Sequence, residues 1–130
     1  MFKKRTIMKR SQFLLVTALL SFMFGFLLFF GPAAPARMWG IPHDPLTVSL
    51  LRGLGGLIIG FGMINFLLRG QADARVYKAV LWTNIITNLF GLAADLLGVS
   101  AGTLNLTKMA PVELTHAFII IGSFFFGVFG

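Results

Sequence analysis

The chain has 130 residues with 57% hydrophobic and 12% charged side chains, and its mean hydropathy is +0.88. Soluble domains average about 45–50% apolar and about 25% charged residues, so this composition excludes the ordinary soluble classes and indicates an integral membrane protein. The net charge of +7 lies largely in the first ten residues, which argues against a nucleic-acid surface, and the lack of cysteine excludes disulfides and thiolate chemistry.

Four segments are long and apolar enough to cross a bilayer as helices. They are residues 13–30, 46–68, 76–97 and 111–130. Inside a membrane every backbone amide needs a partner within the protein, which favours helices over irregular chain. We therefore expect an all-α fold, an integral membrane four-helix bundle that forms a single domain over residues 1–130.

The first segment also has features of a secretory signal, because a basic start and an apolar run precede Ala34-Pro35-Ala36. Its apolar run over residues 13–30 is longer than the ~7–15 residues of a signal core, and prolines surround the expected cleavage site. We expect an uncleaved first helix.

The distribution of cations predicts the orientation of the bundle. The basic N-terminus lies on the same side as Arg69 and Arg75, whereas Arg37 and Lys108 lie on the other side. We expect both termini to be cytoplasmic, in a multi-pass protein of the bacterial inner membrane. Residues 31–47 then form an outer loop, whose four prolines cannot continue a helix across the gap and in which Trp39 is an interfacial anchor.

Polar side chains interrupt the last three segments and, in this topology, lie between the midplane and the outer surface. They are Arg52, Asn84, Asn88, Asp95, Glu113 and His116. The spacing of Asn84, Asn88, Gly91 and Asp95 keeps them within about 40° on one helix face. This spacing predicts a polar seam along the third segment.

Arg52 is expected to face the bundle and to pair with Asp95 or Glu113, because a charge at the centre of a membrane helix costs about 2.5–3.5 kcal/mol. Two interpretations of the cluster remain open. In the first, it forms a ligand pocket whose floor is Asn84 and Asn88. In the second, the charged groups reach the headgroups and the asparagines only join helices.

Glycines in the second segment share the stripe of Arg52. Gly53, Gly56 and Gly60 fall on this face, and Gly56-x-x-x-Gly60 is a spacing that permits close approach of another helix. We expect these three glycines, together with Gly91, to be helix-packing positions.

Other chemistry is sparse. Glu113 and His116 form one Glu-x-x-His step, which with Asp95 is a conceivable metal site, although helical di-iron bundles use two such steps and further glutamates. No nucleophile and base stand at a typical spacing. We assign no catalytic residue, no metal and no cofactor.

A resemblance to a known group rests on a few local features. The first helix ends at Phe30-Gly31-Pro32, a proline-rich loop follows, Leu51-Arg52-Gly53-Leu54-Gly55-Gly56 opens the second helix, and an acid opens the fourth. This arrangement resembles the bacterial four-helix small membrane proteins of unknown function in the DoxX-like neighbourhood. The resemblance implies a fold and a membrane location. Those proteins often carry an acid just before the arginine, where this chain has Ser49-Leu50-Leu51, so no charged site is carried over.

Three functions follow as hypotheses. The first is a non-catalytic accessory subunit that docks onto other integral membrane subunits within the lipid bilayer. The second is a binder or carrier of a lipid-like or quinone-like amphiphile in the outer polar pocket. The third is an intramembrane isomerase-type enzyme, in which Asp95, Glu113 and His116 would transfer protons.

Overall fold

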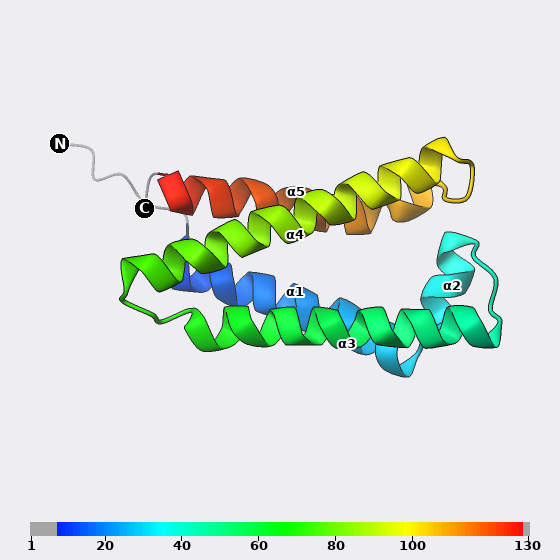
Figure 1. The fold of residues 1–130 in the computed structure, drawn as a ribbon, viewed down its shortest axis with the longest axis horizontal. Helices are drawn as coiled ribbons and strands as arrows, with labels where there is room; N and C mark the ends of the chain where they lie inside the picture. The colour runs from blue at the N-terminus through cyan, green and yellow to red at the C-terminus, as the bar shows by residue number, and fades with distance from the viewer. Residues whose placement is uncertain (1–7, 129–130) are drawn as a thin grey trace.

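The computed structural model describes residues 8–128, and within this range the chain forms five helices and no strand (Figure 1). The helices are α1 (Arg10–Phe30), α2 (Ala33–Trp39), α3 (Pro45–Leu68), α4 (Ala74–Ser100) and α5 (Leu106–Val128). All but α2 are long and apolar enough to cross a membrane. The expected all-helical chain with four long apolar helices is confirmed. The cations Lys3, Lys4 and Arg5 lie outside the described residues.

The long helices form two side-by-side pairs, α1 with α3 and α4 with α5 (Figure 1). We call the end where α1 begins the N-terminal end and the opposite end the α2 end. At the N-terminal end the two pairs share a hydrophobic core. This core consists of Phe13, Leu14, Tyr77, Val80 and Leu81. Toward the α2 end the pairs diverge, and α2 lies between them in contact with α1 and α5.

Glycines bring the backbones of α1 and α3 into direct contact. A Cβ atom added to Gly55 would lie 2.7 Å from the carbonyl oxygen of Gly25, and one added to Gly25 would lie 2.9 Å from the oxygen of Gly55. Both separations are far below a normal contact, so only glycine fits at this crossing. The buried face of α3 accordingly carries Leu51, Gly55, Gly62 and Asn65.

The three other glycines of α3 do not have the internal packing role expected from the sequence. A Cβ atom added to Gly53, Gly56 or Gly60 would meet nothing within 4 Å, and all three residues are exposed. The physical reason is helical phase. Gly56 lies about 100° around the helix from Gly55, so the two glycine patterns cannot face the same neighbour. The chain uses the Gly55 face for its own packing and leaves the Gly56 face open.

Aspartates cap two of the long helices at their N-termini. The Asp44 carboxylate accepts hydrogen bonds from the N–H groups of Leu46 and Thr47 at 2.9 and 3.0 Å, and Asp73 caps α4 in the same way. The hydrogen bond from the backbone of Thr47 is the main reason that the pKa of Asp44 lies below its ordinary value. These caps define where α3 and α4 begin.

No helix continues across residues 31–47, as expected from their four prolines, but a short helix that was not expected, α2, forms within this loop. Pro32 is its N-cap and Pro35 lies in its first turn, where backbone N–H groups have no helical partner to lose. Similarly, α5 begins at Leu106 rather than at Pro111. The Asn105 side chain accepts the N–H of Lys108 at 3.2 Å and so caps the earlier start.

Candidate functional site

Two asparagines join the helix pairs inside the bundle. Asn84 Nδ2 donates to Asn65 Oδ1 at 2.8 Å, and Asn65 Nδ2 donates to Asn84 Oδ1 at 3.1 Å. Both residues are fully buried. Asn65 also donates to the carbonyl oxygen of Phe61 at 3.0 Å. This reciprocal amide pair connects α3 to α4 and satisfies most of the polar atoms that the two side chains bury.

The chain of hydrogen bonds continues from Asn84 into α5. Asn88 Nδ2 donates to the backbone oxygen of Asn84 at 2.8 Å, which directs its Oδ1 toward His116. The His116 Nδ1 atom lies 2.8 Å from this oxygen, so the imidazole carries a proton on Nδ1. The other ring nitrogen, Nε2, lies 3.7 Å from Asp95 Oδ2, which is an ion-pair distance when the imidazole is protonated. We call the set of Asn65, Asn84, Asn88, His116 and Asp95 the polar network.

Glu113 lies at the edge of the polar network, near enough to Asp95 and His116 to interact electrostatically with both. Both oxygens of its carboxyl group are buried, and neither makes a hydrogen bond of normal geometry within the described residues. Three groups that can gain or lose a proton are thus gathered where α4 and α5 face each other. The structure therefore brings together five of the six predicted polar residues.

The sixth predicted residue, Arg52, is placed elsewhere. Its side chain is exposed on α3, and within residues 8–128 it forms no ion pair with Asp95 or Glu113. The expected pairing is therefore not made inside the chain. Arg52 lies on the open face with Gly53 and Gly56, about 100° away from the buried face that begins at Leu51, which turns its guanidinium away from the bundle.

The polar network can join helices through hydrogen bonds and can bind protons. A metal site would need a different arrangement of side chains. Within residues 8–128, no group of three His, Cys, Asp or Glu side chains is arranged to hold a metal ion. The Glu-x-x-His step therefore has no support as a metal site from the geometry. One interpretation placed Asn84 and Asn88 on a pocket floor. Instead, the side chain of Asn84 pairs with Asn65, and that of Asn88 bonds to the backbone oxygen of Asn84 and to His116.

A family model described as a domain of unknown function (DUF8292) matches residues 15–129. The chain belongs to this family. The matched range includes every member of the polar network and the whole of α2, α3 and α4. The family is uncharacterised, as the sequence resemblance implied, but the match is to DUF8292 and shows no DoxX-like family. No curated protein and no solved structure matches the chain.

Asn65 is the member of the polar network that sequence reasoning missed in this DUF8292 domain. The spacing of residues in the sequence indicates that Asn65 lies on the buried face of α3. Gly55, Gly62 and Asn65 follow one another at steps of seven and three residues, which places them on one face of α3. The only glycine of α1, Gly25, stands opposite that face. The Gly56-x-x-x-Gly60 spacing is the more familiar motif, but it lies on another face of α3, where an added Cβ would meet nothing within 4 Å.

Gly91 provides a test of whether His116 needs its observed position. A Cβ atom added to Gly91 would lie 2.6 Å from His116 Cε1, so a Gly91→Ala substitution must displace the imidazole and break its hydrogen bond to Asn88. We expect a loss of about 1–3 kcal/mol in unfolding free energy, measured by thermal unfolding in detergent.

A second background isolates the contact. In a His116→Ala protein the same Gly91→Ala change should have little effect, because the ring that it would strike is gone. Equal destabilisation in both backgrounds would show that Gly91 matters for another reason.

Proposed function

We propose that this protein is a non-catalytic accessory subunit that spans the bacterial inner membrane four times and docks onto a larger integral membrane protein through the open face of α3. The length and apolar character of α1, α3, α4 and α5 support the membrane location. The distribution of cations between the two ends of the bundle supports a cytoplasmic location for both termini. The N-terminal end carries Lys9, Arg10, Arg69, Arg75 and Lys78, against Arg37 and Lys108 at the α2 end.

The observation that carries the proposal is the open glycine face of α3. Gly53, Gly56 and Gly60 have no neighbour within 4 Å of an added Cβ, although Gly55 on the same helix is in backbone contact with α1. Large apolar side chains flank this face, with Leu54 and Leu57 exposed. Small residues at such spacing allow a second helix to approach closely, and van der Waals contact is a main source of helix association in lipid.

Arg52 indicates the chemistry of the partner helix. It lies seven residues after the start of α3 at Pro45, which corresponds to about 10 Å of helix. A charge at such a depth is costly in lipid unless it is paired or reaches the interface. A helix with a carboxylate at the same depth would neutralise it. A second copy related by a two-fold axis through this face would instead bring one Arg52 near another, so the proposed partner is a different chain.

Photo-crosslinking in native membranes tests this proposal. A crosslinking residue at Gly56 should capture one membrane protein, whereas the same residue at Ile121, which is also exposed but lies on α5, should not capture it. An Arg52→Gln substitution should reduce the capture about tenfold or more, because it removes a charge-assisted contact. Gly56→Leu should also block capture.

Two outcomes would overturn the proposal. The first is that Gly56 and Ile121 capture the same neighbours. The second is that Arg52→Gln and Gly56→Leu leave capture unchanged while both proteins keep the thermal stability of the parent. Because both positions are exposed, neither substitution should disturb the fold, and that stability measurement is the control.

The other two hypotheses have less support from the geometry. An amphiphile in the polar network would have to compete with hydrogen bonds that already join Asn65, Asn84 and Asn88. A proton-transfer enzyme would use the cluster of Asp95, Glu113 and His116, which does come together, but the described residues place no substrate-binding cation or nucleophile with it.

A further inference from the structure

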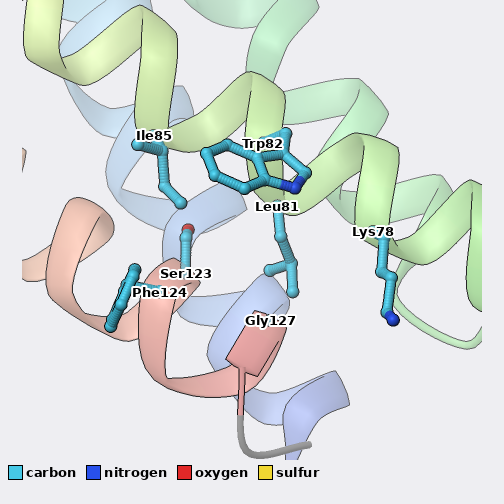
Figure 2. Close-up of a pocket in the computed structure, with 7 residues that line it drawn as sticks. All are labelled: Lys78, Leu81, Trp82, Ile85, Ser123, Phe124 and Gly127. Carbon is cyan, nitrogen blue, oxygen red and sulfur yellow. The ribbon is translucent and has the colours of Figure 1, made fainter.

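A groove between α4 and α5 lies near the N-terminal end of the bundle, far along the helices from the polar network's charged end. Leu81, Trp82 and Ile85 of α4 form one wall, and Phe124 of α5 forms part of the other (Figure 2). The groove holds a cavity of about 40 Å³. A water molecule occupies about 30 Å³ in the liquid, so this space accepts one or two groups of methylene size. A larger occupant would continue out of the groove along the surface.

The groove is open because α5 carries a glycine there. A Cβ atom added to Gly127 would lie 3.5 Å from Leu81 Cδ1, so a larger side chain at this position would fill the space. Trp82 and Phe124 are 59% and 54% exposed and stand at the rim. The rim is therefore aromatic and apolar, and in the proposed orientation it faces the acyl chains of the cytoplasmic leaflet.

Ser123 is the one hydroxyl group in the groove, and it lacks a partner. Its side chain is fully buried, and its Oγ atom makes no hydrogen bond within residues 8–128. Figure 2 shows the hydroxyl pointing from α5 toward Ile85 on α4. A buried hydroxyl without a hydrogen bond is unfavourable, so an occupant that offers an acceptor oxygen would be stabilised here.

Two cations stand beside the groove on α4. Lys78 lines its end, and Arg75 lies one turn earlier on the same face of the helix. The nearest acid in the chain, Asp73, directs its carboxylate to the N–H groups of Arg75 and Val76 as a helix cap. Within the described residues neither cation forms an ion pair. Their positive charge is available to an anionic ligand.

The depths of these groups match those of a phospholipid. Lys78 lies four residues from the start of α4, and Ser123 lies five residues from the end of α5, which places both about 6–8 Å from the helix ends. The flexible amine of Lys78 can extend outward to a phosphate. In the proposed orientation, the Ser123 hydroxyl, which is buried and cannot extend outward, is assigned to the level of the ester carbonyls that join the phosphate region to the acyl chains.

We propose that the α4–α5 groove binds one anionic phospholipid of the cytoplasmic leaflet. The phosphate contacts Lys78 and Arg75, an ester carbonyl accepts a hydrogen bond from Ser123, and the first methylene groups of one acyl chain enter the space above Gly127 between Trp82 and Phe124. This inference depends on the proposed membrane orientation but not on the docked partner of α3.

Fluorescence quenching of Trp82 tests the inference on the purified chain. In a Trp39→Phe background Trp82 is the only tryptophan. This protein is reconstituted in phosphatidylcholine vesicles that contain a small fraction of brominated phosphatidylglycerol or, in parallel, brominated phosphatidylcholine. We expect brominated phosphatidylglycerol to compete about tenfold better for Trp82, the preference that two cations near an anionic surface provide.

Variants distinguish the contribution of the lipid headgroup from that of the space that receives the acyl chain. Arg75→Gln combined with Lys78→Gln should remove the preference, while Arg37→Gln combined with Lys108→Gln, a matched loss of two cations at the α2 end, should keep it. Gly127→Leu should reduce quenching by both lipids, and Gly127→Ala is a milder version whose methyl group meets Leu81 at an ordinary contact distance.

The inference is overturned if the two lipids quench Trp82 equally, or if the preference persists in the Arg75 and Lys78 double variant. It is also overturned if Gly127→Leu retains full quenching in a protein of unchanged thermal stability. The vesicles contain no other protein, so these results are independent of whether α3 docks onto a partner.

Discussion

A Gly55→Ala substitution will lower the thermal stability of the protein, while Gly56→Ala, one residue later, will leave it unchanged or slightly higher. The methyl group at Gly55 must enter the space of backbone atoms on α1, where the Gly25 oxygen and the Phe29 nitrogen both lie at 2.7 Å. A backbone cannot rotate aside as a side chain does, so α1 and α3 must separate. We expect a loss of about 1–3 kcal/mol, the usual range for overpacking.

The comparison with Gly56 makes this prediction specific to the packing of Gly55. At Gly56 the methyl group meets open space, and alanine has the higher helix propensity by about 1 kcal/mol. Thermal unfolding in one detergent, followed by circular dichroism, compares the two variants directly. Gly25→Ala should reproduce the Gly55 result from the other side of the crossing. Equal effects at Gly55 and Gly56 would contradict the observed packing of α1 on α3.

An Asn84→Leu substitution will also destabilise the bundle, because it leaves the buried amide of Asn65 with only the Phe61 oxygen as a partner. The unsatisfied group costs about 1–3 kcal/mol. Thr83→Ala on the same helix is the control, since Thr83 is exposed and its hydroxyl bonds only to the Ala79 oxygen of its own helix.

A double-mutant cycle distinguishes the asparagine pair from two independent sites. Asn65→Leu with Asn84→Leu should cost less than the sum of the single changes, since no amide is then left unpaired. Measured interhelical hydrogen bonds in membranes couple by about 0.6 kcal/mol on average and by about 1.7 kcal/mol at most. Strictly additive losses in unfolding free energy would show that the two side chains do not interact.

The positions of the long helices follow from hydropathy, because four long and predominantly apolar runs favour helices of membrane-spanning length. The short helix α2 was not predicted, because the prolines of this loop were considered only as a barrier to one continuous helix. Their places at the N-cap and in the first turn decide the outcome, since those positions need no amide hydrogen.

The polar network was predictable in part. The 4, 3, 4 spacing of Asn84, Asn88, Gly91 and Asp95 describes one face of one helix, and such a face needs no knowledge of the neighbours. Arg52 was harder to place. A charge on an apolar helix can be satisfied within its own chain, at the interface or by another protein, and the sequence of one chain does not distinguish these. The choice depends on which face of α3 meets α1, and that was decided by Gly55 and Gly25.

The pairing of α1 with α3 and of α4 with α5 has a consequence for biogenesis. Each tight contact joins long helices that are consecutive along the chain, so the first pair can form once the chain has emerged from the ribosome as far as Leu68. In the proposed membrane location, the protein can therefore insert as two successive hairpins, each of them close-packed. Its assembly then depends on the lateral meeting of two preformed halves, at which Asn65 and Asn84 recognise each other.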